Sequence, residues 1–432
     1  MDQPVGYRQL LRKNEAVRSV WLSQVFGQSG DWLNLVALFT LVGRGTEPAT
    51  AIAVILSLHY LCPFFWGPLA GMAADRLNRR TILIVSDAIR IPIVLGFIWF
   101  GDSVSTVFLL AAIQYSAGAF FEPTRTALTQ ELAQGRELLA ANSLGMATYG
   151  ASGALGMVGG GLLIASFGTN VCFIADAITF ALSIYFVAQL KQRSTDGVVS
   201  GTKDSPRSWK DLFALLAKGK RLSHTFLVKF SLGLLGGGYW VIVVRYAQDI
   251  FAVGESGSIS NGIINGCMFV GAFVASFIVN SWLGDERHMP RAVFGILLIR
   301  IVLMIVLFGA PFLLGVGPVG IVLGYTIVIV AVFSQTIAGA SGYILSTQML
   351  KDLAPSEFHG RIFALDLGLM NLGFGASAVA VGTMIDSKIF TLIDSNLYIA
   401  ACLTPLALLW LYVVVGWNSW GTEKAGVEKV AQ

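Results

Sequence analysis

Gln24, Gln28 and Asp31 are polar residues within an otherwise apolar run over residues 19–42. On a helix, the spacing i, i+4, i+7 places them on one face, within about 60° of one another. A carboxylate near the middle of a bilayer is costly unless something compensates its charge, so this polar stripe must face a neighbouring helix or a water-filled cavity. Two roles fit Asp31: binding a cationic group or a proton, or forming a buried structural pair.

Other apolar runs also carry charged residues. Asp87 and Arg90 have i, i+3 spacing and can pair with each other, which favours a structural role. Asp176 is expected to be structural as well. Lys229 and Arg245 lie near opposite ends of one predicted helix, where long side chains can reach the polar interface.

Residues on several more predicted helices could complete a polar cavity with aromatic walls. The alternative for each of them is plain packing, which is a stronger explanation for any one residue than for the whole set. The predicted residues for binding substrate or protons are Asp31, Gln24, Gln28, Gln114, Tyr239, Trp240, Gln335, Asp366 and Asn371.

Signatures of hydrolytic or redox chemistry are missing from the sequence. It contains no G-x-x-x-x-G-K-[ST] phosphate loop, and no H-E-x-x-H or G-x-S-x-G motif with plausible partners. The four cysteines are far apart in apolar segments and are expected to be small buried hydrophobic residues. The sequence therefore predicts neither an enzyme nor a cofactor, a metal site or a nucleic-acid partner.

The composition indicates how these residues are positioned. Of the 432 residues, 55% are hydrophobic and 12% are charged, against roughly 25% charged residues in ordinary soluble domains. The mean hydropathy is +0.72. Twelve apolar runs are long enough to span a bilayer as helices, so the sequence predicts an all-α, multi-pass membrane protein. These runs cover residues 19–42, 49–74, 80–101, 104–127, 140–166, 169–190, 225–247, 259–282, 290–314, 317–346, 359–385 and 394–417.

Basic residues set the predicted orientation. Of the 29 Lys and Arg residues, five lie inside predicted helices and two (Arg44 and Lys388) lie in segments on one side. The remaining 22 lie on the other side with the N-terminus, in the segments there or at the helix ends that border them. Cytoplasmic segments are enriched in Lys and Arg. We therefore expect both termini to be cytoplasmic, in an inner (plasma) membrane, and the polar start of the chain is not expected to be a cleavable signal peptide.

A polar stretch over residues 191–223 divides the chain into two predicted six-helix bundles, residues 1–190 and 224–432, the second ending in a short cytoplasmic tail. The first part of this stretch is a predicted linker, and an amphipathic helix is predicted from Trp209. The halves also share a pattern: residues 132–144 read LAQGRELLAANSL, and residues 353–365, which begin 221 positions later, read LAPSEFHGRIFAL. This match favours an internal duplication, the arrangement in which transporters place a binding site between repeats.

Residues 67–80, GPLAGMAADRLNRR, connect two predicted helices. Here Gly71 is expected to allow close helix approach, Asp75 to end a helix, and three arginines to fix a tight turn. The stretch resembles the signature G-x-x-x-D-R-x-G-R-R of the major facilitator superfamily, with Asn78 in place of a glycine. Since Asn tolerates the left-handed conformation better than most residues, we expect the turn to persist.

Residues 120–144 and 353–365 are similar to those of the enterobactin-exporter and macrolide-efflux branch of that superfamily. The resemblance implies twelve helices in two pseudo-symmetric bundles. It also implies a monomeric, lipid-embedded secondary transporter that exports a small molecule, such as a drug or siderophore, coupled to protons or another ion by alternating access. The alternatives are a lipid, lysophospholipid or metal-ion transporter of the same fold, an intramembrane enzyme, and a non-transporting receptor.

The same resemblance assigns a gate and shows two departures. Asp75 could pair with Arg125 or approach the start of the helix predicted from residue 359. Gln114 stands where many proton antiporters carry an arginine, and Met157 replaces the proline of a G-P-x-x-G-G motif, although glycines spaced for close helix contact remain. The residues assigned to the gate are Gly71, Asp75, Arg76, Arg79, Arg80, Glu122, Arg125 and Arg361.

Overall fold

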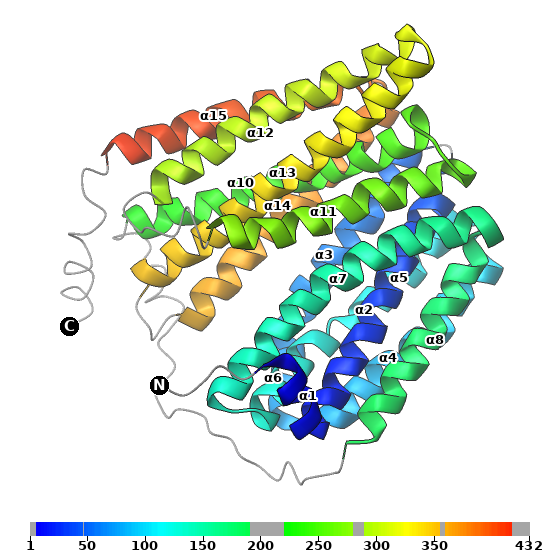
Figure 1. The fold of residues 1–432 in the computed structure, drawn as a ribbon, viewed down its shortest axis with the longest axis vertical. Helices are drawn as coiled ribbons and strands as arrows, with labels where there is room; N and C mark the ends of the chain where they lie inside the picture. The colour runs from blue at the N-terminus through cyan, green and yellow to red at the C-terminus, as the bar shows by residue number, and fades with distance from the viewer. Residues whose placement is uncertain (1–5, 46, 191–219, 280–288, 355–358, 417–432) are drawn as a thin grey trace. The chain divides into compact units, whose positions relative to one another are not determined.

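The computed structural model describes residues 6–45, 47–190, 220–279, 289–354 and 359–416. The predicted linker and amphipathic helix between the halves lie almost entirely outside these residues. Within them, the protein is helical, and each of the twelve predicted apolar runs forms helix (Figure 1). Among the described residues, eleven helical segments are long and apolar enough to cross a membrane. The twelfth, α2 (Glu15–Val42), has the length but carries the polar stripe.

The first half also contains seven further helices among the described residues. They are α1 (Tyr7–Lys13), α3 (Pro48–Arg76), α4 (Arg79–Phe100), α5 (Val104–Gly118), α6 (Phe121–Leu132), α7 (Gly135–Phe167) and α8 (Thr169–Ala188). Of these, α1 precedes the first predicted run, and α3, α4, α7 and α8 each follow one run. The helices of the second half are α10 (Lys220–Arg245), η1 (Tyr246–Ile250), η2 (Glu255–Gly257), α11 (Ser258–Ile278), α12 (Met289–Gly309), η4 (Ala310–Val316), α13 (Pro318–Leu353), α14 (His359–Asp386) and α15 (Asp394–Gly416).

The run predicted over residues 104–127 is broken into α5 and α6. The backbone N–H of Phe120 bonds to the carbonyl of Ala117, three residues back, which tightens the end of α5. Pro123 has no N–H with which to bond the carbonyl of Ala119, four residues earlier. The helix is therefore interrupted at this point.

Asparagine side chains cap the N-termini of two helices. Asn14 accepts a hydrogen bond of 3.1 Å from the N–H of Val17 at the start of α2, and Asn78 accepts one of 3.2 Å from the N–H of Thr81 at the start of α4. The φ of Asn78 is −63°, so the expected left-handed conformation is wrong. Asn78 replaces the usual glycine as an N-cap residue instead.

The chain forms two compact units, and the first contains residues 1–201 and 247–269. Within it, α2 packs against α7 and α8, and α4 packs against α8. Glycines permit the α2–α7 approach, as expected: a Cβ at Gly156 would lie 2.7 Å from Cβ of Trp32, and one at Gly160 would lie 3.3 Å from Cα of Leu33. At Gly150, by contrast, a Cβ would meet no described atom within 4 Å.

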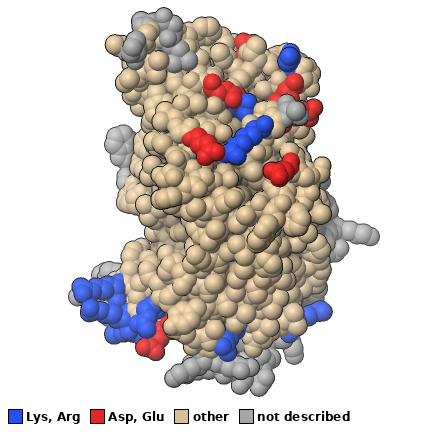
Figure 2. All heavy atoms as spheres, turned by 90° about the vertical axis from the view of Figure 1, so that its right-hand side faces the viewer, with Lys and Arg blue, Asp and Glu red and all other residues tan. Residues whose placement is uncertain are grey.

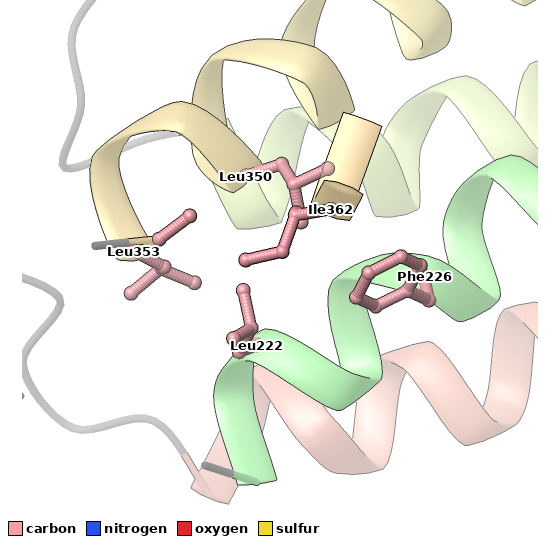
Figure 3. Packing of buried hydrophobic residues seen from close by; sticks show 6 residues of the cluster. Leu222, Phe226, Leu350, Leu353 and Ile362 are labelled. Carbon is pink, nitrogen blue, oxygen red and sulfur yellow. The ribbon is translucent and has the colours of Figure 1, made fainter. Parts of the chain in front are cut away.

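The second unit contains residues 202–246 and 270–432. Its main helix pair is α10 with α14, where the Cβ of any larger residue at Gly233 or Gly237 would clash with a carbonyl oxygen of α14. At one end of this pair, Leu222 and Phe226 of α10 meet side chains from α13 and α14, including Leu350 and Ile362 (Figure 3). The predicted division into residues 1–190 and 224–432 stays a prediction.

The surface has the character that hydrocarbon contact requires. On the face drawn in Figure 2, Lys, Arg, Asp and Glu gather toward two ends and leave a broad uncharged zone between them. Large apolar side chains are exposed on the spanning helices, among them Trp99, Leu155 and Val322. Such exposure would be unfavourable in water but is favourable in lipid. Cys172 is buried and the other three cysteines are partly buried, all as free thiols.

Candidate functional site

Arg90 of α4 lies at the centre of a charged cluster in the first unit. Its Nη1 donates to both carboxylate oxygens of Asp31 on α2, at 3.2 and 3.3 Å. The Asp31 side chain is 34% exposed, whereas that of Arg90 is only 5% exposed. The polar stripe predicted on α2 therefore meets a cation from another helix, and Asp31 keeps an accessible edge.

Asp87, one turn before Arg90 on α4, is the second carboxylate of the cluster. Nη2 of Arg90 donates to its Oδ1, as the i, i+3 spacing predicts. Its Oδ2 accepts a 2.6 Å hydrogen bond from Oγ of Ser183 on α8. Asp87 and Ser183 are fully buried, so Asp87 fixes the guanidinium from the interior while Asp31 binds it from the accessible side.

Asp176 of α8 is the third carboxylate. Nδ2 of Asn34, on α2, donates to its Oδ2 at 2.7 Å, and Thr179 donates to its Oδ1 at 3.4 Å. Gly30 makes this approach possible, because a Cβ there would overlap Thr179 and Asp176. Asp176 also interacts electrostatically with Arg90 and with Asp31, so the three carboxyl groups form one cluster.

Aromatic rings and a glycine enclose the guanidinium. Cζ of Arg90 lies 4.1 Å from the ring centroid of Phe180 and 5.5 Å from that of Phe121. A Cβ at Gly118 of α5 would lie 3.4 Å from Nη1 of Arg90, so this glycine gives the guanidinium its place against α5. Ring faces attract a cation, and their apolar surface keeps water away from it.

The cluster has more acid than base. Asp31, Asp87 and Asp176 would together place three negative charges around one positive charge if all were ionised. Among the described residues, Arg90 pairs with Asp31 and Asp87 and interacts electrostatically with Asp176. Uncompensated charge in a bilayer interior is costly. Neutrality of the cluster requires two protons, and Asp31 is its one partly exposed carboxyl group.

Gln24 and Gln28 extend the stripe along α2. Nε2 of Gln24 donates to Oε1 of Gln28 at 3.1 Å and to the carbonyl oxygen of Gly145, on α7, at 3.0 Å. Gln24 is buried and Gln28 is partly exposed. The stripe is thus hydrogen-bonded along its length to α7 at one end and to α4 at the other.

Lys229 and Asp366 form a second buried ion pair, in the other unit. Nζ of Lys229, on α10, bonds Oδ2 of Asp366, on α14, and lies 4.4 Å from the ring centroid of Tyr343. Both charged side chains are at most 3% exposed. The expectation that Lys229 reaches the polar interface is therefore wrong, because a carboxylate in the bundle offers it a closer partner.

The remaining predicted binding residues are all buried. Gln114 of α5 lies one turn before Gly118 and has an Oε1 without a partner in the described part of the chain. In the second unit, the indole of Trp240 packs edge-on against Phe374, with centroids 6.0 Å apart. The other predicted residues of that unit, buried to at least nine-tenths, are Tyr239, Gln335 and Asn371.

Comparison with known proteins identifies the family. A family model described as Major Facilitator Superfamily matches residues 20–328, which is more than half of the chain. The chain belongs to the Major Facilitator Superfamily. It is a multi-pass membrane transporter and not an enzyme, as the resemblance in its sequence implied.

Relatives and solved structures agree with this membership. BacE of Bacillus subtilis (strain 168), provisionally named a bacilysin exporter, is 24% identical over 371 residues, covering 83% of this chain and 86% of BacE. An auto-inhibited peptide transporter of the POT family has a TM-score of 0.73 at 13% identity, over 92% of this chain and 96% of that one. The nucleoside transporter NupG has a TM-score of 0.66 at 14% identity, over 92% of this chain and 98% of that one.

Two arginines of the superfamily's loop signature, Arg79 and Arg80, form hydrogen bonds with neighbouring helices. Arg79 donates to the carbonyls of Ala74 and Ala127, at 3.0 and 3.2 Å, and to Oε2 of Glu131 at 3.0 Å. Arg80 donates to the carbonyl of Ala188 at the end of α8. These two residues of the predicted gate tie α4 to α3, α6 and α8 within the first unit.

The other predicted gate residues are arranged differently from the expectation. Arg125 pairs with Glu122 on α6, with its Nε donating at 3.0 Å to Oε2, rather than with Asp75. Asp75 and Arg76 are exposed at the end of α3.

Two further gate predictions concern Gly71 and Arg361. A Cβ at Gly71 would meet no described atom within 4 Å, and the prediction that this glycine permits close helix approach stays a prediction. Arg361 lies in the first turn of α14, and its side chain is outside the described part.

Three features of the site were not predicted from the sequence. They are Asn34, Ser183 and the role of the Arg90 guanidinium as a link between two carboxylates. Asn34 follows Asp31 by three positions on α2, so its place on the polar side of that helix could be read from its spacing. Ser183 gives no such signal, because a lone serine in an apolar helix commonly bonds its own backbone.

Proposed function

We propose that this protein exports a small molecule by alternating access, driven by protons, as a monomer in an inner membrane with both termini in the cytoplasm. The observation that carries the proposal is the partly exposed carboxylate of Asp31, bound to buried Arg90 in a cluster that has two carboxyl groups in excess. Export is supported by the relative BacE, which is provisionally named a bacilysin exporter.

Protonation of Asp31 is the proposed coupling event. A proton on Asp31 removes its negative charge and weakens both of its bonds with Arg90, which then rests on Asp87 alone. Because Asp31 lies on α2, which contacts α7 and α8, and Arg90 lies on α4, the change in charge alters the contact between helices of one bundle. Moving one charge across 100 mV supplies ~2.3 kcal/mol, which corresponds to roughly fifty-fold accumulation.

The variant Asp31→Asn tests this role. In proteoliposomes with an imposed proton gradient, and with bacilysin and ethidium as probes, wild-type protein should accumulate at least one probe against its gradient. D31N should lose uphill transport while it keeps a folded elution profile and gradient-independent exchange of the same probe. The matched control D102N changes an exposed aspartate outside the cluster and should transport like wild type. Full gradient-driven efflux by D31N would refute the role of Asp31.

A specific groove favours a second candidate, transport of a lipid or lysophospholipid. A groove of about 560 Å³ between α3, α4 and α5 is lined mostly by apolar side chains, among them Trp66, Val85, Ile113 and Phe120. Such a surface fits an acyl chain. Movement of a fluorescent lysophospholipid between leaflets of proteoliposomes, blocked by Val85→Arg and unaffected by D31N, would favour this function over ion-coupled export.

A further inference from the structure

The two halves of the chain contain the same arrangement around an arginine. Arg90 and Arg300 are each the twelfth residue of their helices, α4 and α12. Gln114 with Gly118 on α5 matches Gln335 with Gly339 on α13, and these pairs are 221 positions apart, like the matching segments at residues 132 and 353. The geometry matches too, because a Cβ at Gly339 would lie 3.7 Å from Nη1 of Arg300, as a Cβ at Gly118 would lie 3.4 Å from Nη1 of Arg90.

The two arrangements differ in their acids. The motif Gly-Asp-Trp on α2 corresponds to Gly-Tyr-Trp on α10, so Tyr239 occupies the position of Asp31. Leu297, three residues before Arg300, occupies the position of Asp87. The second half therefore has the arginine, but a tyrosine and a leucine stand at the positions of its two carboxylate partners.

Arg300 is left without an acidic partner in the part of the chain that the structure describes. It is 4% exposed, no carboxylate oxygen there lies within 4.0 Å of it, and its Nε has no hydrogen-bond partner. A buried guanidinium without a counter-charge is strongly unfavourable, since water no longer solvates it. The arrangement therefore requires an anion from outside the described chain.

Two buried polar residues on the helices that approach Arg300 also lack partners among the described residues. Tyr239, 3% exposed, is close enough to interact electrostatically with Arg300, and its hydroxyl makes no hydrogen bond. Gln335, 1% exposed, lies on the face of α13 that carries Gly339, one turn away, and neither its Oε1 nor its Nε2 has a partner. Three buried polar side chains from α10, α12 and α13 thus offer unused hydrogen-bond donors.

We propose that Arg300, Tyr239 and Gln335 form a binding site for the carboxylate group of a small molecule. The first half shows the corresponding complex, in which Arg90 binds both oxygens of the Asp31 carboxylate. Replacement of that side chain by Tyr239 leaves a guanidinium, a phenol and an amide as donors for a carboxylate supplied from outside. A planar guanidinium matches two carboxylate oxygens better than it matches a spherical halide.

Binding to the purified full-length protein in detergent tests the site without transport, so the result is independent of the role proposed for Asp31. The melting temperature should be followed by tryptophan fluorescence while acetate replaces chloride at constant ionic strength. Wild-type protein should show a saturable rise with acetate. The variant R300M should lose the rise, corresponding to at least tenfold weaker binding. The control R291M, which changes an exposed arginine on the same helix, should keep it.

A second variant keeps the test valid if R300M does not fold. Leu297→Asp copies the Asp87–Arg90 pair and gives Arg300 an internal counter-charge, so L297D should be as insensitive to acetate as R300M. An acetate response that persists in both variants would overturn the site, as would a wild-type protein that melts at the same temperature in acetate and chloride.

The source of the carboxylate is distinguished by a matched pair of probes. Alanylalanine carries a carboxylate on a larger solute, and its C-terminal amide is the neutral control. Tighter binding of alanylalanine than of acetate, lost in the amide and in L297D, would indicate that the site takes the carboxylate of a solute. Equal binding of acetate and alanylalanine would indicate a site for a small carboxylate anion such as acetate.

Discussion

Asp87 and Asp31 bind the same guanidinium but should respond very differently to removal. Asp87 is fully buried and also bonds Ser183, whereas the Asp31 side chain is 34% exposed. Breaking a buried ion pair by removing one partner costs about 3–5 kcal/mol, because the other charge stays buried without compensation. Since Arg90 would keep Asp31 as a partner, we expect the cost of Asp87→Ala to lie at the lower end of this range, about 3 kcal/mol in the free energy of unfolding.

Asp31→Ala should cost far less stability. Partly exposed ion pairs contribute about 0–1 kcal/mol, and Arg90 would keep its buried partner Asp87. The two variants therefore separate structure from function: D87A should lower the melting temperature of purified protein in detergent clearly, while D31A should leave it nearly unchanged and abolish gradient-driven transport in proteoliposomes.

The comparison can fail in a defined way. If D31A destabilised the protein as much as D87A, Asp31 would be a structural partner of Arg90 and the argument from its exposure would be wrong. Asp87→Asn is the matched control, because it keeps the volume and one acceptor for Ser183. It should fall between wild type and D87A in melting temperature.

Two further changes test the packing of each unit. Gly30→Ala places a methyl group on Thr179, and overpacking of this kind costs about 1–3 kcal/mol. G30A should therefore melt at a lower temperature than the control Gly6→Ala, where a Cβ would meet no described atom within 4 Å. Lys229→Met and Asp366→Leu should each cost about 3–5 kcal/mol in denaturant titration, whereas the double variant should recover most of this loss. Additive losses in the double variant would contradict a coupled pair.

The helices could be predicted from the sequence because the bilayer imposes a simple requirement on each of them. A segment in hydrocarbon must satisfy its own backbone and present apolar side chains over its length, so run length alone located α3 or α15 within a few residues. The break between α5 and α6 was missed because the residues around it, such as Phe120, are apolar. It depends on a missing backbone donor at Pro123 and not on hydropathy.

The site could be predicted only in part, since spacing describes one helix at a time. The stripe on α2 and the Asp87–Arg90 pair follow from helical periodicity. The link from Arg90 to Asp31 joins residues 59 positions apart on different helices, and no local pattern contains it. Lys229 was misplaced for the same reason, because its partner Asp366 lies on another helix of the bundle.

The position of Arg90 also explains the unusual glutamine on α5. The resemblance to the superfamily places Gln114 where many proton antiporters carry an arginine. Here a guanidinium reaches α5 from α4 and lies against Gly118, one turn further along. The positive charge beside α5 is thus supplied by Arg90 of α4. The same placement of an arginine against a glycine recurs in the second half with Arg300 and Gly339. One half then holds its arginine with Asp31 and Asp87, which suits proton exchange, and the other holds Tyr239 and Leu297, which leaves the arginine free to bind an anion.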